Sequence, residues 1–498
     1  MPTKIISLND LKNKKNFILG YGHFSTIHPG HIRYLKHAKS LGSYLVIALK
    51  GDGTLIEKKY KYQFSQSERA EALSMLDIAD ALILLYEDEI DEIVKNTNPK
   101  ILILGKQFEK KPEERISISI KLLSKRGKSV LFHGGEISYS NSELLTSTEN
   151  EMKLKRKKAF LSACKRHSLS QKDLLDSMKK WSNSSLIVIG DTIVDRYVAC
   201  EALGMSAEAP VLVVKELQNR DFCGGAAIVA SDIKSLGAKC KLISVIGDDH
   251  YGNYVKEKLV EEEIADGLII DSSRPTTFKK RYLVENQKLF RVTRLEQTEV
   301  KKSIEDQIIN ELEISAKKAD GIVISDFVYG VITPNVLEKI DQLSKKYNLQ
   351  LFGDLQCSSQ IGSILKFKNL SLLCPNEREA RIALHEKDLD LELISHQIIK
   401  KTNSYNLIMK LASEGFILYY KKNQEIFSQA FPALSTNPID VTGAGDSLLA
   451  VMAVGLSISQ DIMTTSAIAC CMTSLAVEKL GNKPIKYEEL RLAIMENL

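Results

Sequence analysis

The chain has 498 residues, 44% of them hydrophobic and 26% charged, and a formal net charge of +5. This length exceeds one ordinary core, so we expect two or three globular domains, and the composition excludes a disordered or collagen-like chain. The eight cysteines lack paired metal-binding spacing, which argues against a disulfide framework and favours a reducing, cytoplasmic location. We find no signal peptide, and polar residues interrupt the apolar stretch 448–477, which predicts two buried helices and no membrane partner.

The first 145 residues predict a compact, Rossmann-like domain. Apolar runs at 16–20, 44–49, 81–86, 100–104 and 129–132 alternate with amphipathic segments at 30–41, 67–76 and 89–95. Short strands separated by helices are joined by right-handed crossovers into a parallel sheet. We therefore assign residues 1–145 to one α/β domain.

Residues 146–183 are rich in lysine and lack strand signals, which predicts a basic helical connector. Residues 151–180 contain ten Lys or Arg against three Asp or Glu. Such a run could bind RNA or anionic lipid, but no aromatic residues are interleaved with it as in nucleic-acid sites. We favour a solvated linker helix and expect no nucleic-acid partner.

Residues 184–498 contain a second α/β system. Strands are predicted at 185–190, 211–214, 240–246, 321–324, 349–353 and 416–420. The alternating, arginine-rich stretch 276–295 predicts a small β-flap beside this sheet. The fold class is therefore α/β, with two parallel-sheet domains.

Two histidines, His28 and His31, follow the first predicted strand and its terminal glycines. Glycine lets the backbone approach a ligand, and the next helix directs its N-terminal amides and positive dipole end toward the same place. Imidazoles there can donate hydrogen bonds to phosphate oxygens as charge develops. A His-x-x-His pair by itself is more often an incidental surface feature.

Residues 22–31, Gly-His-Phe-Ser-Thr-Ile-His-Pro-Gly-His, resemble the G-x-F-D-x-x-H-x-G-H signature of cytidylyltransferase-like nucleotidyltransferases. The resemblance implies that His28 and His31 are catalytic. It also implies that nucleotide phosphates contact Gly22, Phe24, Ser25, Arg69, Gly105, Ser140 and Ser142. Ser25 replaces the signature aspartate, so a catalytically degenerate nucleotide-binding module is the alternative to a working transferase.

Near the C-terminus, Gly443, Ala444 and Gly445 precede an apolar helix that begins with Asp446. Backbone amides of such a turn, together with the helix N-terminus, form an anion hole. Asp446 is placed to take a proton from an attacking hydroxyl, and the helix dipole is expected to keep its pKa low. A lone Gly-Ala-Gly-Asp also occurs as a helix-capping turn.

The segments 224–227, 247–252, 375–379 and 440–446 together resemble the ribokinase-like (PfkB) carbohydrate kinases. The resemblance implies that Asn376 and Glu379 arrange phosphates and Mg²⁺, with Glu379 acting on the metal through water, and that the kinase domain pairs as a homodimer. Substrate contacts are expected from Asp191, Asp195, Gly224, Gly225, Lys280 and Arg281. Other flap cations, Lys279, Arg291 and Arg294, could also bind a phosphate-bearing sugar, although an exposed charged flap explains them equally well.

The segments 190–197, 207–211 and 274–277 resemble the kinase half of bifunctional ADP-heptose synthases, in inverted domain order. That family phosphorylates heptose 7-phosphate at O1 and later attaches AMP to heptose 1-phosphate, making an activated sugar for surface glycan such as lipopolysaccharide. Two positions depart from it: Ile228 replaces an asparagine, and Leu355-Gln356 replaces Pro-Lys. The implied co-substrates are a sugar phosphate and ATP. The alternatives are another sugar or polyol phosphate and CTP at the N-terminal site.

Overall fold

The computed structural model describes residues 3–12, 14–24, 27, 29–52, 64–105, 108, 112–133, 149–208, 211–285, 287–356, 362–386, 389, 391–423 and 425–498. The chain divides into two compact units. The first comprises Met1–Thr148 with Glu386–Ile394, and the second comprises Glu149–His385 with Ser395–Leu498.

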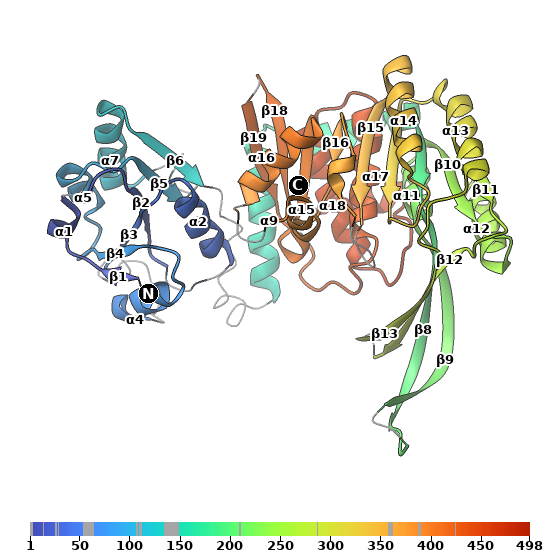
Figure 1. The fold of residues 1–498 in the computed structure, drawn as a ribbon, viewed down its shortest axis with the longest axis horizontal. Coiled ribbons are helices and arrows are strands. Elements are labelled where there is room, and N and C mark those ends of the chain that lie inside the picture. Colours follow the sequence, from blue (N-terminus) through green and yellow to red (C-terminus); the bar gives the residue numbers. More distant parts are fainter. Residues whose placement is uncertain are drawn as a thin grey trace. The chain divides into compact units, whose positions relative to one another are not determined.

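The first unit is built on one parallel sheet with the strand order β1-β4-β3-β2-β5-β6 (Figure 1). Its strands are β1 (Lys4–Ile5), β2 (Ile18–Gly22), β3 (Leu45–Leu49), β4 (Ala81–Leu84), β5 (Ile101–Gly105) and β6 (Ser129–His133). Its helices are α1 (Leu8–Lys12), α2 (Pro29–Ser40), α4 (Gln66–Met75), α5 (Ile90–Asn96) and α7 (Glu114–Lys125). The chain runs from β2 to β3 on one side and returns to β5 on the other, so the topological switch point lies between β2 and β5.

Side chains alternate along the strands and fill two cores, one on each face of the sheet. Leu19 and Val46 pack with apolar residues of α1, α5 and α7. Ile18 and Ile47 pack on the other face with α2 and α4. Helices on both faces bury the strands completely, which explains their continuous apolar sequences.

The second unit contains a nine-stranded sheet with the order β11-β10-β7-β14-β15-β16-β17-β18-β19. Its strands are β7 (Ser185–Gly190), β10 (Lys239–Ile246), β11 (Ala265–Ile270), β14 (Gly321–Asp326), β15 (Gln350–Leu355), β16 (Leu372–Leu373), β17 (Asn406–Lys410), β18 (Phe416–Lys422) and β19 (Glu425–Phe431). The pairs from β11 to β17 are parallel, and β17, β18 and β19 are antiparallel.

Helices cover both faces of this sheet. They are α9 (Glu149–Arg166), α10 (Gln171–Met178), α11 (Ala226–Ser235), α12 (His250–Glu261), α13 (Lys302–Ala316), α14 (Pro334–Tyr347), α15 (Glu377–Leu384), α16 (Leu391–Thr402), α17 (Ala444–Ser457), α18 (Ile462–Val477) and α19 (Tyr487–Asn497), with short 3-10 turns at Trp181–Asn183, Ile364–Lys366 and Ala412–Glu414. Val323 and Phe352 share a core with α11, α17 and α18. The neighbouring residues Ile324 and Leu351 point to the opposite face, where they line a pocket with Leu337 of α14.

The flap is a four-stranded sheet of order β13-β12-β8-β9, larger than expected from the sequence. Two 14-residue strands, β8 (Thr192–Met205) and β9 (Leu212–Gly225), form a long antiparallel ribbon that leaves the main sheet (Figure 1). β12 (Thr277–Val284) and β13 (Gln287–Arg294) pair beside it. The alternating stretch identified in the sequence is therefore half of this sheet.

The α/β fold class is confirmed, with one main sheet in each of two domains and a β-flap, as are two buried helices over 448–477, namely α17 and α18. The basic segment is helical but is not a solvated linker. Phe160 of α9, Leu174 of α10 and Trp181 are fully buried in the core of the second unit. The apolar residues between the lysines thus anchor the helices. Within the described residues no helix is both long and apolar enough to cross a bilayer.

Candidate active sites

A cavity of about 540 Å³ lies in the second unit at the carboxyl ends of the sheet strands. This is the edge where open α/β sheets bind ligands. Nine of the residues expected at the kinase site line it: Asp195, Gly225, Arg281, Asn376, Glu379, Gly443, Ala444, Gly445 and Asp446. They come from segments separated by more than 200 residues in the sequence.

The turn before α17 forms one end of this cavity. Gly443 is the N-cap of α17 with φ of 84°, a conformation that side-chain-bearing residues rarely adopt. The first amides of α17 have no partner within the helix, and Gly443, Ala444 and Gly445 line the end of the cavity, so these amides can bind phosphate oxygens. Asp446 lies in the first turn and accepts a hydrogen bond from Gln356 Nε2 at 2.9 Å.

The expectation that the helix dipole keeps the pKa of Asp446 low is wrong. Asp446 is only 5% exposed, and burial together with the nearby Asp354, Asp232 and Asp195 raises its pKa well above 3.8, although Lys410 acts in the opposite direction. A raised pKa makes Asp446 a stronger proton acceptor than an exposed carboxylate.

Asn376 and Glu379 form a reciprocal capping box at the start of α15. Asn376 Oδ1 accepts the Glu379 amide at 2.9 Å, and Glu379 Oε2 accepts the Asn376 amide at 2.9 Å. Each side chain therefore fixes the other while both line the cavity. The cap places a carboxylate at a helix N-terminus, near where phosphates would bind.

Three cations line the flap end of the cavity: Lys279, Arg281 and Arg291. Lys279 is 2% exposed and Arg281 is 9% exposed, since both point inward from β12. Arg291 stands directly opposite Arg281 on β13. Lys280 does not line the cavity, and its ammonium pairs with Glu216 at 2.7 Å. Strand alternation therefore separates Lys280 from the site that was expected to include it.

Asp195 and Asn482 connect the flap to the Gly443–Gly445 turn, which is called the anion turn below. Arg281 donates to Asp195 Oδ1, and Asn482 Nδ2 donates to Asp195 Oδ2 at 2.9 Å. A Cβ atom on Gly443 would lie 2.8 Å from Asn482 Oδ1, and one on Gly224 would lie 2.5 Å from Asp195 Oδ2. Within the described residues, Asn482 Oδ1 is buried with no hydrogen-bond partner. A buried carbonyl oxygen of this kind can accept a ligand hydroxyl.

Asp191, expected to hold sugar hydroxyls, is used by the backbone. Its carboxylate accepts amides of Phe327 at 2.8 Å, Tyr329 at 3.2 Å and Val331 at 3.4 Å. Asp191 is 2% exposed and does not line the cavity, and burial and then the neighbouring Asp326 raise its pKa to about 6. Through these hydrogen bonds Asp191 fixes the backbone conformation of the loop after β14.

In the first unit, the switch point brings together two predicted residues, Gly22 at the end of β2 and Gly105 at the end of β5. Helix α2 is tied to both strands through Tyr34. The Tyr34 hydroxyl accepts the Tyr21 amide at 3.0 Å and donates to the Ile103 carbonyl at 2.8 Å. The helix that carries His31 is therefore fixed over the crevice in which such folds bind nucleotides.

Phe24 and His31 lie next to each other, with ring centroids 4.9 Å apart. Phe24 is 3% exposed and belongs to the core beneath α2, and its ring would be 2.9 Å from a Cβ atom on Gly22. Phe24 thus supports the turn rather than presenting a free face to a ligand. His28, Ser25, Ser140 and Ser142 lie outside the described residues.

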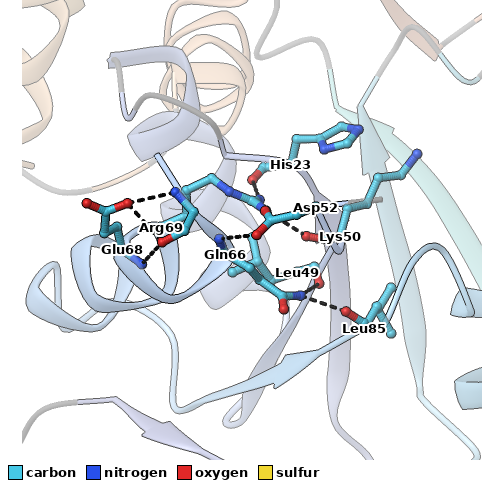
Figure 2. A network of polar contacts seen from close by, with 9 residues as sticks. His23, Leu49, Lys50, Asp52, Gln66, Glu68, Arg69 and Leu85 are labelled. Carbon is cyan, nitrogen blue, oxygen red and sulfur yellow. Dashed lines mark hydrogen bonds and ion pairs between the residues drawn. The ribbon is translucent and has the colours of Figure 1, made fainter. Parts of the chain in front are cut away.

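Arg69, expected to bind nucleotide phosphates, instead forms the centre of a buried polar network (Figure 2). Its guanidinium donates to the His23 carbonyl, to the Lys50 carbonyl at 3.0 Å and to Asp52 Oδ1 at 2.7 Å. Asp52 also accepts the Gln66 amide at 3.0 Å. Arg69 therefore joins the chain segments that follow β2 and β3, which border the switch point.

Two family models match this chain. A family model described as pfkB family carbohydrate kinase matches residues 183–486. The chain belongs to the pfkB family of carbohydrate kinases. A second model, described as Cytidylyltransferase-like, matches residues 19–195.

Two relatives of this pfkB kinase carry the name Bifunctional protein HldE. The one from Campylobacter jejuni (strain RM1221) is 32% identical over 61% of this chain and 64% of its own length. The one from Helicobacter acinonychis (strain Sheeba) is 31% identical over 62% of this chain and 66% of its own length. The alignments thus span just under two thirds of those relatives. Phosphofructokinase-2 from Escherichia coli, solved with substrates and products, has the same fold as the kinase unit, with a TM-score of 0.53 at 14% identity over 63% of this chain and 99% of that one.

Among the lining residues of the pfkB kinase cavity that sequence reasoning missed are Asn482 and Lys410. Asn482 lies in a turn after α18, and Lys410 ends a strand for which no expectation was made. Neither belongs to a local motif. Only the parallel order of the strands brings Lys410 beside the Gly443–Gly445 turn.

Proposed function

We propose that the second unit transfers the γ-phosphoryl group of ATP to a hydroxyl of a phosphorylated sugar. The observation that carries this proposal is that the two ends of the cavity carry different groups. The anion turn and the carboxylate of Asp446 lie at one end, and the cations Lys279, Arg281 and Arg291 lie at the other. Arg281 and Arg291 stand directly opposite each other on neighbouring strands and both line the cavity, so together they suit a phosphate placed between them.

In the proposed reaction, the acceptor hydroxyl attacks the γ-phosphorus in line, and Asp446 takes the hydroxyl proton. The amides of the Gly443–Gly445 turn stabilise charge on the phosphoryl oxygens, and positioning provides most of the remaining catalysis. Asp195 and Asn482 orient the sugar hydroxyls, because a carboxylate and an amide oxygen both accept hydrogen bonds.

Glu379 fits a role in holding Mg²⁺, since its carboxylate is 4% exposed and lines the cavity at a helix N-terminus. Within the described residues no group of three or more His, Cys, Asp and Glu side chains could hold a metal ion. When bound, Mg²⁺ would neutralise charge on the β- and γ-phosphate oxygens.

We propose that the first unit is a nucleotidyltransferase in which a sugar 1-phosphate attacks the α-phosphate of a nucleoside triphosphate and releases pyrophosphate. Support comes from the topological switch point, where Gly22, Gly105 and the helix carrying His31 converge. The resemblance to ADP-heptose synthases makes heptose 7-phosphate and heptose 1-phosphate the preferred sugars and ATP the preferred nucleotide. CTP and another sugar or polyol phosphate remain the second candidate.

We also propose that kinase units pair through the flap. Exposed apolar side chains gather on its long strands and on β13: Leu203, Met205, Leu212, Leu217, Phe290 and Val292 are 47–61% exposed. A second copy of the same sheet would bury them.

A cytoplasmic location agrees with the seven free cysteines among the described residues.

The proposed function is tested by two product assays on the full chain. ADP release is measured with ATP and heptose 7-phosphate, and pyrophosphate release is measured with heptose 1-phosphate against ATP and CTP in parallel. His31→Ala should abolish pyrophosphate release and leave ADP release unchanged. Absence of both products with every sugar offered would refute the pairing of activities, and loss of ADP release in His31→Ala would contradict two separate sites.

A further inference from the structure

Lys410 is a partly buried lysine at the last position of β17. Its Nζ donates to both carboxylate oxygens of Asp354, at 2.8 Å and 2.6 Å. The Lys410 side chain is 16% exposed and that of Asp354 is 1% exposed. Burial lowers the pKa of the ammonium, but Asp354 and Glu379 outweigh burial and raise it. The side chain therefore brings a permanent positive charge into the cavity.

The ammonium lies against the anion turn. A Cβ atom on Gly445 would be 3.2 Å from Lys410 Nζ and 3.8 Å from Asp354 Oδ2. Of the cations that line the cavity, Lys279, Arg281 and Arg291 belong to the flap. Arg156 belongs to α9, where it donates to the carbonyls of Ser435 and Ser413. Lys410 is the cavity-lining cation whose ammonium lies beside the turn that would hold the phosphates. Lys288 also reaches the turn segment, where it donates to Thr442 Oγ1 at 3.0 Å, but it does not line the cavity.

This end of the cavity is otherwise acidic. Asp354, Asp446 and Glu379 are each 5% exposed or less, and a triphosphate would add more negative charge. Gln356, which occupies a position where related kinases were expected to have lysine, contributes only a neutral amide to Asp446. A positive charge at this place would stabilise a transferring phosphoryl group.

We infer that Lys410 is a catalytic residue whose ammonium contacts the transferring phosphoryl group, in place of a cation at position 356. In the step, the acceptor oxygen forms a bond to the γ-phosphorus, the bond from that phosphorus to the β,γ-bridging oxygen breaks, ADP leaves, and Asp446 holds the hydroxyl proton. Lys410 stabilises negative charge on the phosphoryl oxygens and exchanges no proton. Asp354 keeps the ammonium in place before the nucleotide arrives. The inference rests on the proposed kinase function.

The test compares Lys410→Met with Asp354→Asn in the full chain. A purely structural ion pair predicts equal losses, since either change leaves one buried charge without its partner. A phosphoryl-contacting lysine predicts asymmetry: kcat falls about 10²- to 10³-fold in Lys410→Met and far less in Asp354→Asn, where the bound triphosphate still pairs with the ammonium. Lys422→Met, at the exposed end of β18, is the matched control and should keep wild-type kcat.

A second readout does not depend on the sugar. Calorimetric titration compares ADP with a non-hydrolysable ATP analogue, both with Mg²⁺. Lys410→Met should weaken binding of the analogue about tenfold or more, with ADP changed much less, because only the analogue carries the γ-phosphate. Gln356→Lys added to Lys410→Met should restore part of this preference, since residue 356 borders Asp446 in the same cavity.

Equal losses in Lys410→Met and Asp354→Asn, or equal weakening of ADP and the analogue, would overturn the inference. If Lys410→Met does not fold, the titration is made on the double variant Asp354→Asn/Lys410→Met, which leaves neither charge of the ion pair. If the double variant still binds the ATP analogue in preference to ADP as the wild type does, the inference is overturned. Failure of the wild-type chain to phosphorylate heptose 7-phosphate would count against that sugar and leave the titration result intact.

Discussion

Replacing Asp446 with asparagine should abolish most kinase activity and at the same time stabilise the fold. Asparagine has nearly the same shape, and its Oδ1 can still accept the hydrogen bond that Gln356 Nε2 donates at 2.9 Å. The amide cannot accept the hydroxyl proton, so kcat should fall about 10²- to 10⁴-fold, the range for loss of a general base. This corresponds to about 3 to 5 kcal/mol in the activation barrier.

The stability change follows from the raised pKa of Asp446, which burial and then Asp354 produce. Because the folded chain holds this proton more tightly than the unfolded chain, ionisation of Asp446 destabilises the fold. That destabilisation is absent below the ordinary pKa of 3.8, grows as the pH rises toward the folded-state pKa, and is complete above it. Asp446→Asn should therefore have a higher Tm than wild type at pH 8, and the difference should shrink as the pH is lowered.

Scanning fluorimetry from pH 5 to pH 8.5 measures Tm, and ADP release measures kcat on the same samples. For a unit of this size, each kcal/mol of relieved repulsion should raise Tm by about 2 °C. Asp306→Asn, whose side chain is 61% exposed, is the control and should change neither quantity. A Tm for Asp446→Asn below wild type at pH 8, or a kcat within tenfold of wild type, would refute this account of the site.

The remaining predictions concern the flap, the first unit and assembly. Arg281→Met should raise the KM for a phosphorylated sugar about 10- to 100-fold, since a charge-assisted contact is lost. Lys280→Met, one residue along β12 but facing away from the cavity, should leave this KM unchanged. Equal effects would contradict the conclusion that Arg281 points into the cavity and Lys280 does not. Arg69→Met should destabilise the first unit by about 2 to 4 kcal/mol, because its hydrogen bonds to the Lys50 carbonyl and to Asp52 are lost. Calorimetry should show a lower unfolding temperature for one of two transitions, with ADP release preserved. An unshifted unfolding transition would show that this network does not stabilise the first unit. Leu212→Glu, on the exposed strand β9, should convert a dimer to a monomer in light scattering, and an unchanged mass would rule out pairing through this surface.

Local sequence patterns were sufficient to predict the α/β class, the main sheet of each unit and the positions of the glycine-containing turns. Apolar runs matched strands such as β7 and β10 because buried parallel strands are apolar on both faces. The segment 440–446 contains the turn before α17, where Gly443 adopts a φ of 84°, which glycine tolerates better than other residues do. The long strands β8 and β9 were largely missed, since apolar and polar side chains do not alternate regularly along their exposed halves.

The chemical state of the site depended on tertiary structure. Whether Asp446 has a low or a raised pKa depends first on its burial and then on the carboxylates of Asp354, Asp232 and Asp195, which only the folded chain brings near it. Asp191 and Arg69 satisfy buried backbone groups, a role that depends on which loops pass beside them. By itself the sequence determined which backbone conformations form, because those are local; the sheet order decided which charges meet, because electrostatic energy depends on distance in space and on burial rather than on separation along the chain.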